Sequence, residues 1–223
     1  MAINLEKIND KILSYNAKLL PVVKNRSNNE IKFIYDSNFR DFGENRLDDF
    51  YEHSRVFKDV KYHFIAPIQS RKLKEICNSF TYVHTINRNK EIKLLESFDF
   101  KGEFFIQMNL DNDPNKSGID ENSLNNIIEN CLESNLFPCG LMTIPNINSD
   151  PKKIYSKMEQ LNNNLKKEYN FYKGELSMGM SGDFEVALDY GSTIVRIGTK
   201  LFDNVWKIFD FNRIKAAYKF RGF

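Results

Sequence analysis

Two turns rich in small residues lie close together in the C-terminal third of the sequence. The first is Leu176-Ser-Met-Gly-Met-Ser181, and the second ends the segment Ile194-Val-Arg-Ile-Gly-Thr199. Such turns leave backbone N–H groups free to converge on an anion, and a helix that begins just after one adds the positive end of its dipole. Together the two turns predict a cup for a phosphate group.

A lysine much earlier in the chain has the setting of a nucleophile. Lys24 closes the apolar segment Val22-Val23, so we expect its ammonium group to be partly desolvated at the end of a strand. Desolvation favours the neutral amine, which is the form that attacks an aldehyde to give a Schiff base. An ordinary solvated lysine fits the same position, since position without a ligand does not identify a reactive amine.

A single arginine interrupts the last apolar strand. Arg196 lies within the segment 194–197, where strand alternation would turn it towards the interior or the mouth of the fold. A guanidinium group stays charged in practice, so a buried one needs an acceptor. Either a ligand atom or a structural ion pair with Asp183 or Glu185 would provide it.

Other familiar motifs are missing or weak. The run Gly179-Met-Ser-Gly182 matches neither the nucleophile elbow of a hydrolase nor a P-loop. His53, His63 and His84 lack the spacing of metal ligands, so we expect core residues and no metal site. The pair Glu44-Asn45 follows a glycine and indicates turn chemistry, with Asn45 as a helix cap.

Strands and helices that alternate along the chain must position these side chains. Short apolar segments are typical of buried strands, and apolar residues at helical spacing predict the helices between them. The predicted strands span residues 18–24, 39–45, 61–67, 82–86, 103–109 and 136–143, and the two small-residue turns supply the seventh and eighth. The predicted helices span residues 1–16, 29–36, 46–57, 70–80, 124–132 and 151–169, with another that ends at 97.

This alternation predicts a single (β/α)8 TIM barrel. Right-handed crossovers leave a closed barrel or a doubly wound open sheet as the main choices. Residues at the predicted strand ends come from the whole chain, which suits the shared mouth of a barrel, where the loops after strands seven and eight usually hold phosphate. Those strand-end residues are Lys24, Asn45, Gln69, Asn109, Met142, Ser181 and Arg196.

Composition limits the class of protein. With 223 residues, 41% of them hydrophobic, the chain fits one globular domain over residues 1–223. A net charge of +2 gives no basic footprint for nucleic acid, and no stretch is apolar enough to span a bilayer. Cys77, Cys131 and Cys139 form no C-x-x-C pair, so we expect reduced thiols in a cytoplasmic protein.

The tail, residues 203–223, has apolar and basic residues at helical spacing. Such a helix can lie on a membrane or a partner, but a helix that closes the barrel needs the same kind of apolar face. We expect the tail to be a helix folded against the barrel.

An ordered set of motifs resembles the pyridoxal phosphate homeostasis protein family. The match runs from about residue 18 to residue 202. Its motifs are Val22-Val-Lys24, Phe42-Gly-Glu-Asn45, His63-Phe-Ile-Ala-Pro-Ile-Gln69-Ser, His84-Thr-Ile, Lys116-Ser-Gly118, Gly140-Leu-Met142, Leu176-Ser-Met-Gly-Met-Ser181 and Val195-Arg-Ile-Gly-Thr199. That family is similar in fold to the barrel domain of alanine racemase and binds pyridoxal 5′-phosphate (PLP) without a well-established catalytic reaction.

The resemblance implies a role for each site residue. Lys24 would form the Schiff base, Asn45 would lie beside the cofactor ring, and Arg196 would face the pyridine nitrogen. The residues that would hold the phosphate are Ser181, Gly198 and Thr199. Some positions depart from the usual pattern of the family, namely Val23, Ala66, Arg71 and Gly182.

The resemblance implies a PLP-binding protein of PLP homeostasis that hands its cofactor to PLP-dependent apoenzymes, and we expect a monomer. An amino-acid racemase or lyase with Lys24 as its base is the alternative. A third possibility is an interaction module whose pocket has decayed. Lys116, on a loop expected at the same mouth, is a candidate second acceptor of the aldehyde.

Overall fold

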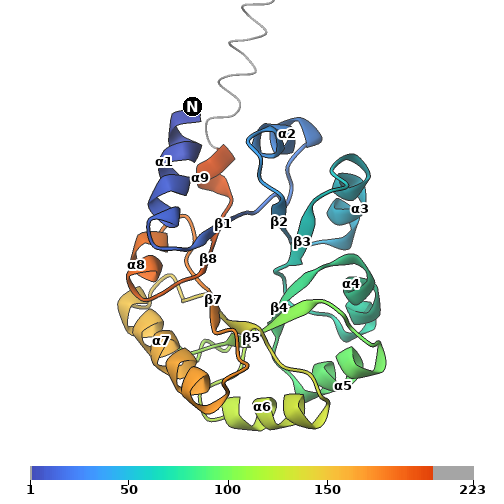
Figure 1. The fold of residues 1–223 in the computed structure, drawn as a ribbon, viewed down its shortest axis with the longest axis vertical. Helices are drawn as coiled ribbons and strands as arrows, with labels where there is room; N and C mark the ends of the chain where they lie inside the picture. The colour runs from blue at the N-terminus through green and yellow to red at the C-terminus, as the bar shows by residue number, and fades with distance from the viewer. Residues whose placement is uncertain (1, 203–223) are drawn as a thin grey trace, which may run out of the picture.

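Eight parallel strands form one sheet that curves into a barrel surrounded by helices (Figure 1). This computed structural model describes residues 2–202. The strands are β1 (Lys18–Pro21), β2 (Asp41–Glu44), β3 (Lys61–Phe64), β4 (Tyr82–Ile86), β5 (Glu103–Met108), β6 (Gly140–Thr143), β7 (Glu175–Ser177) and β8 (Ile194–Ile197). Their hydrogen-bonded order is β1-β8-β7-β6-β5-β4-β3-β2, so the predicted TIM barrel is confirmed.

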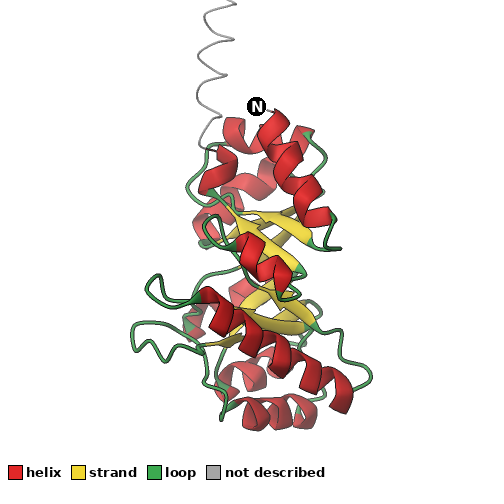
Figure 2. Cartoon of the chain, turned by 90° about the vertical axis from the view of Figure 1, so that its left-hand side faces the viewer, coloured by secondary structure: helices red, strands yellow, loops and turns green. Residues whose placement is uncertain are grey.

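Helices alternate with these strands along the chain and lie outside them (Figure 1, Figure 2). They are α1 (Ala2–Leu13), α2 (Asn28–Asp36), α3 (Leu47–Val56), α4 (Leu73–Ser79), α5 (Asn89–Ser97), α6 (Leu124–Glu133), α7 (Pro151–Glu168), α8 (Phe184–Asp189) and α9 (Thr199–Phe202). A 3-10 turn, η1 (Ser70–Lys72), leads into α4. Among the described helices, none has both the length and the hydropathy to cross a membrane.

Local capping chemistry sets where two of the helices begin. Ser27 and Glu30 form a capping box at the start of α2, with the Ser27 N–H donating to Glu30 Oε2 at 2.9 Å. Helix α7 begins after Asp150, whose carboxylate accepts the N–H of Lys152 at 3.0 Å, and Pro151 occupies its first position. Both helices begin within a residue of the positions that the apolar spacing predicted.

The barrel closes between β1 and β2 through a short contact. Val22 pairs with Gly43 as an isolated bridge, and the Val23 N–H donates to Gly43 O at 3.0 Å. The Val22 N–H instead donates to Ile197 O of β8, so Pro21, one residue earlier, faces β2. Proline has no N–H to donate, and pairing with β2 therefore starts only after it.

Apolar and polar side chains both fill the barrel interior. An apolar cluster contains Leu20, Phe105, Cys139, Met142 and Ile194. His84 of β4 contacts Ser177 of β7 at 2.8 Å, and because these strands are not neighbours in the sheet, the contact crosses the interior. A larger core lies between the sheet and the helices around it.

Several predicted strands are shorter than expected: β1 ends at Pro21 rather than at residue 24, and β3 ends at Phe64 rather than at residue 67. Strand β6 begins at Gly140 rather than at residue 136, because the apolar residues before it pack elsewhere. Phe137 contacts the rings of Tyr169, Phe171 and Tyr172, with centroids 4.7–5.9 Å apart. The apolar residues before β6 therefore belong to an aromatic cluster and not to a strand.

The predicted helix over 203–223 lies outside the described residues.

Candidate functional site

A cavity of about 400 Å³ opens at the carboxyl ends of the strands. Its lining includes every site residue named from the sequence, Lys24, Asn45, Ser181, Arg196, Gly198 and Thr199. The other lining residues are Val22, Arg26, Ile65, Ile144, Met180 and Gly182. These positions follow β1, β2, β3, β6, β7 and β8 or lie near their ends, so the barrel brings residues from the whole chain to one mouth.

Three other strand-end residues were expected at this mouth and do not line the cavity. Met142 is fully buried inside the barrel, in the apolar cluster. Asn109 turns its amide into its own loop, where it donates to Asp113 O at 2.9 Å. Gln69 lies with Asn45 in an adjoining hollow. Position at a strand end is therefore not sufficient to place a side chain in the cavity.

Lys24 is brought to the cavity by a tight turn after β1. Asn25 adopts the left-handed conformation, with φ of 57°, and its N–H lies 3.5 Å from Asp49 Oδ2. Lys24 is exposed to solvent, so the expectation that its ammonium group would be desolvated by strand burial is wrong for this structure. The regular strand ends at Pro21, Val22 and Val23 make the last backbone bonds to the neighbouring strands, and the chain turns out of the barrel wall at Lys24.

The first small-residue turn is held open by glycine and by an aspartate. Gly179 has φ of +92°, and a Cβ there would lie 2.7 Å from Ala187 Cβ, so only glycine fits. The Met180 N–H donates to Asp183 Oδ1 at 2.7 Å, which fixes the start of the turn. Among the described residues, no acceptor pairs with the backbone N–H groups of Ser181 or Gly182.

The second turn follows β8 and faces the first across the cavity lining. Gly198 comes close to β1, since a Cβ there would lie 3.3 Å from Val22 O. Its N–H also has no acceptor within the part of the chain that the structure describes. Thr199 follows with an exposed side chain at the cavity. Backbone donors and hydroxyl groups from both turns thus line one cavity, and the anion cup itself stays a prediction.

Arg196 forms a buried part of the cavity wall, with 3% of its surface exposed. Its Nη1 donates to Ser177 Oγ at 2.6 Å and its Nη2 to Thr143 O at 2.9 Å. Burial lowers the pKa of Arg196 to about 10, which still leaves it charged at neutral pH. Of the two alternatives for its acceptor, the ion pair with Asp183 or Glu185 is not formed in the described structure, where a hydroxyl and a carbonyl accept from the guanidinium.

Asn45 was expected to cap the following helix, and it does not. Arg46 is the N-cap of α3, and no side chain makes a capping hydrogen bond there. The Asn45 side-chain oxygen is buried without a hydrogen-bond partner among the described residues. A buried amide oxygen left unpaired beside a cavity is a natural contact for a polar ligand group.

A buried acid–base pair lies next to Asn45 and was missed from the sequence. Glu44 Oε1 and His53 Nδ1 are 2.5 Å apart, and His53 Nε2 lies 3.0 Å from Arg26 O. This pair links β2 and α3 to the loop that carries Lys24. The glutamate could have been found from its position between a glycine and Asn45, but nothing local marks His53 as its partner.

Lys116 lies beside the cavity and outside its lining. Its Nζ donates to Ile144 O at 3.1 Å and lies 3.8 Å from Asp111 Oδ2 and 4.0 Å from Asp113 Oδ2. Ile144 itself lines the cavity. The role of Lys116 as a second acceptor of an aldehyde stays a prediction.

Charge in the cavity favours an anion. Lys24, Arg26 and Arg196 line it, and none of the described lining residues is acidic. The sequence did not single out Arg26, whose guanidinium also pairs with Glu30 at 3.1 Å. In the described part of the chain, no group of three or more His, Cys, Asp or Glu side chains could hold a metal ion.

Comparison with curated proteins identifies relatives along most of the chain. The chain is 34% identical over 196 residues to the pyridoxal phosphate homeostasis protein of Aquifex aeolicus, covering 83% of this chain and 86% of that protein. It is 34% identical over 199 residues to the protein of the same name from Vibrio cholerae, covering 83% and 84%. No family model matches the chain.

Solved structures share the fold. PipY of Synechococcus elongatus without PLP superposes with a TM-score of 0.82 at 24% identity, over 90% of this chain and 99% of that chain. The same protein with PLP bound gives a TM-score of 0.74 at 23% identity, over 87% and 99%. Alanine racemase from Acinetobacter baumannii gives 0.67 at 14% identity, over 89% of this chain and 56% of the racemase.

Proposed function

Because the chain belongs to the pyridoxal phosphate homeostasis protein family, we propose that it binds PLP in the cavity at the carboxyl ends of the strands. Its role is then to hold PLP and supply it within the cell. One observation carries this proposal. The free N–H groups of two turns, two arginine side chains and an exposed lysine amine line one cavity.

The phosphate of PLP is proposed to bind between the two turns. The backbone N–H groups of Ser181, Gly182 and Gly198 are available to it, and the hydroxyls of Ser181 and Thr199 add further donors. Arg26 supplies a positive charge at the same cavity. This proposed phosphate site depends on backbone N–H groups that make no hydrogen bond to an acceptor in the described part of the protein.

Lys24 is the proposed point of covalent attachment. Its Nζ would form a C=N bond to the aldehyde carbon, and the aldehyde oxygen would leave as water. Solvent exposure of Lys24 supports reversible exchange, since water and competing amines can reach the same atom. That property suits a carrier that both loads and releases its cofactor.

The opposite end of the cavity is proposed to receive the pyridine ring. Arg196 would point its remaining N–H groups towards the ring nitrogen, and the unpaired Asn45 oxygen would lie beside the ring. A cation at that nitrogen disfavours the protonated pyridinium, so bound PLP would be a weaker electron sink than in enzymes that place an acid there.

We favour binding over turnover as the main function. Racemisation needs a proton donor and acceptor on opposite faces of the substrate. Of the described residues that line the cavity, Lys24 is the candidate base, and none is a tyrosine, cysteine, histidine or acid that could act opposite it. A racemase or lyase that uses Lys24 as its only base is the competing hypothesis.

An absorbance titration with PLP tests the proposal. Wild-type protein should develop a visible Schiff-base band, and Lys24→Ala should lack it. Borohydride reduction followed by peptide mapping should place the adduct on Lys24. Lys116→Ala is the matched control, since its amine lies beside the cavity, and it should retain the band. Absence of both band and adduct in the wild type would refute the proposal.

Enantiopure amino acids separate binding from catalysis. Loss of optical activity that is faster than with free PLP and is abolished in Lys24→Ala would favour the racemase hypothesis.

We further propose one domain over residues 1–223, a monomer in the cytoplasm and PLP-dependent apoenzymes as recipients. The three unpaired cysteines support a reducing compartment.

A further inference from the structure

A chain of hydrogen bonds crosses the barrel from Arg196 to Asp41. Arg196 Nη1 lies 2.6 Å from Ser177 Oγ, which lies 2.8 Å from His84 Nδ1. His84 Nε2 lies 2.9 Å from His63 Nδ1, and His63 Nε2 lies 3.0 Å from Asp41 Oδ1. The five residues come from β8, β7, β4, β3 and β2, so only the folded barrel assembles the chain.

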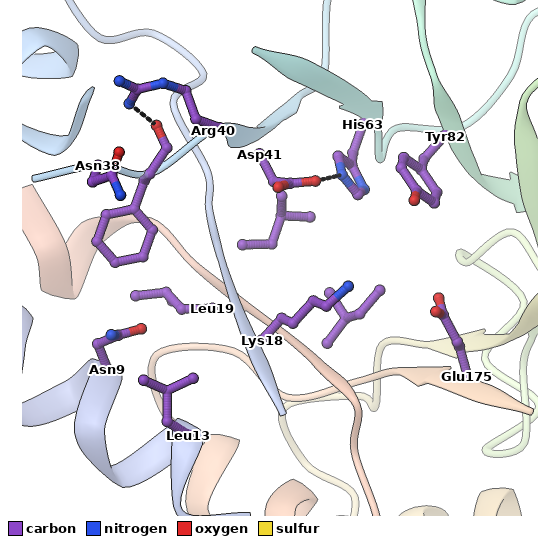
Figure 3. A pocket seen from close by; sticks show the side chains of 13 residues that line it. Asn9, Leu13, Lys18, Leu19, Asn38, Arg40, Asp41, His63, Tyr82 and Glu175 are labelled. Carbon is purple, nitrogen blue, oxygen red and sulfur yellow. Dashed lines mark hydrogen bonds and ion pairs between the residues drawn. The ribbon is translucent and has the colours of Figure 1, made fainter. Parts of the chain in front are cut away.

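The two ends of this chain lie at opposite mouths of the barrel. Arg196 lines the cavity at the carboxyl ends of the strands. Asp41 begins β2 and lines a separate pocket of about 250 Å³ at the amino ends, where Lys18 and Glu175 also point inward (Figure 3). Everything between the ends is at least 97% buried, whereas the Asp41 side chain is 46% exposed.

Every hydrogen bond in this hydrogen-bond chain is donated in the same direction, from Arg196 towards Asp41. Arginine can only donate, so Ser177 Oγ accepts from Arg196. Among the described residues, the acceptor within reach of the Ser177 hydroxyl proton is His84 Nδ1. His84 must then carry its proton on Nε2 and donate to His63 Nδ1. His63 in turn carries its proton on Nε2 and donates to the Asp41 carboxylate.

Charge at the two ends agrees with this direction. Arg196 is a buried cation, and in the described structure no carboxylate lies within ion-pair distance of it. Asp41 is the acid that closes the chain. Burial lowers the pKa of both His63 and His84, and the hydrogen bond from His63 lowers the pKa of Asp41 against the effect of its own burial. Two neutral imidazoles thus connect a cation to an anion.

Other charged groups surround the chain at its exposed end. Lys18 of β1 and Lys61 of β3 face Asp41 and His63 and help to keep the carboxyl ionised and the imidazole neutral. Arg196 has the same effect on the imidazole of His84. Tyr82 stacks on the His63 ring, with centroids 4.1 Å apart. These charged neighbours favour an ionised Asp41 and neutral imidazoles at His63 and His84, which are the charge states that this series of hydrogen bonds requires.

We propose that this chain positions the Arg196 guanidinium from the opposite mouth of the barrel. A chain of donors polarised in one direction strengthens each of its bonds, and a carboxylate at its end strengthens them further. Asp41 therefore influences the cofactor cavity without touching it. The effect on PLP rests on the proposed function, whereas the series of hydrogen bonds does not.

Nitrogen NMR of the histidines in the PLP-free protein tests the chain directly. The protein has only three histidines, so single substitutions assign their signals. His63 and His84 should both be neutral with the proton on Nε2. In Ser177→Ala, the Nδ1 signal of His84 should shift because Nδ1 loses its donor, while the proton stays on Nε2, which still donates to His63. Ser192→Ala is the control, since that buried hydroxyl donates to Met178 O and does not contact either histidine, and it should leave the His84 Nδ1 signal unchanged.

PLP titration tests the long-range effect. Asp41→Asn should weaken binding about 2- to 30-fold and shift the absorbance maximum of bound PLP. Glu175→Gln makes the same change of charge in the same pocket, but Glu175 is not part of the hydrogen-bond chain. This variant should therefore bind PLP as the wild type does. Equal effects of the two variants would overturn the long-range effect and leave PLP binding intact.

The two measurements separate the possible failures. A protonated ring, or Nδ1–H as the main tautomer of either histidine in the wild type, would overturn the chain even if PLP binds. If the histidines show the predicted tautomers but the protein does not bind PLP, the proposed function is refuted and the series of hydrogen bonds is supported.

Discussion

Glu44 Oε1 and His53 Nδ1 lie 2.5 Å apart in a pair that is almost completely removed from solvent. The second carboxylate oxygen, Glu44 Oε2, has no partner among the described residues. His53 also contacts Arg26 O, and Asn45 follows Glu44 in the chain. The pair therefore supports two segments of the cavity wall from behind.

This pair should make stability depend on pH. Burial raises the pKa of Glu44, while the contact with Glu44 raises that of His53 against the opposing effect of burial. The folded pair keeps a proton that an unfolded histidine loses near pH 6.5. The contribution of His53 is therefore complete below about pH 6.5 and is lost as pH rises through its folded pKa, by at most about 1.4 kcal/mol per pH unit. The raised pKa of Glu44 acts in the same direction at lower pH, from about 4.5 upwards.

Urea unfolding at a series of pH values above 6.5 measures this effect. Glu44→Gln should abolish or reverse the slope, because an amide does not favour a charged imidazole. His63 and His84 have lowered pKa values and affect stability below about pH 6.5, so they do not mask it. A slope that is unchanged in Glu44→Gln would contradict the assignment.

Two glycines in the same turn should respond differently to alanine. Gly179 has φ of +92° and its added Cβ would meet Ala187, whereas nothing lies within 4 Å of a Cβ at Gly182. Gly179→Ala should lower the free energy of unfolding by about 1–3 kcal/mol. Gly182→Ala should change it by less than about 0.5 kcal/mol. Urea unfolding of both variants checks the difference, and equal losses would show that the turn tolerates no side chain at all.

The phosphate contacts can be isolated by changing the ligand. Ser181→Ala removes a hydroxyl donor from the anion cup and should weaken PLP binding about 10- to 100-fold. Pyridoxal, which lacks the phosphate, should bind wild type and variant equally. Absorbance titrations with both ligands measure this. A comparable loss with pyridoxal would mean that Ser181 acts on the ring or on the fold.

The three thiols should be inert in the folded protein. Cys131 and Cys139 are buried, and burial raises the pKa of Cys77 and of Cys131 to about 12. Thiolate is the reactive form, so modification by a disulfide reagent at pH 7.5 should be slow until urea unfolds the chain. Fast labelling of one thiol under native conditions would show that its site opens.

The sequence alone was enough for the fold and for six of the residues that line the cavity. Apolar segments at strand and helix spacing predicted the barrel, including helices that begin within a residue of α2 and α7. These signals are local, and parallel strands joined by helices have few ways to close. Ordered motifs then placed Lys24 and Arg196 at the same mouth, where the cavity contains both.

Tertiary structure alone decided how those side chains are held. Lys24 is exposed because the chain turns outward directly after Val23, and Arg46 instead of Asn45 takes the capping position of α3. The partners of Arg196 are 19 and 53 residues away in sequence, and the bond from His84 to Ser177 spans 93. Such pairings depend on which strands face one another across the barrel, and no local pattern of residue types contains that information.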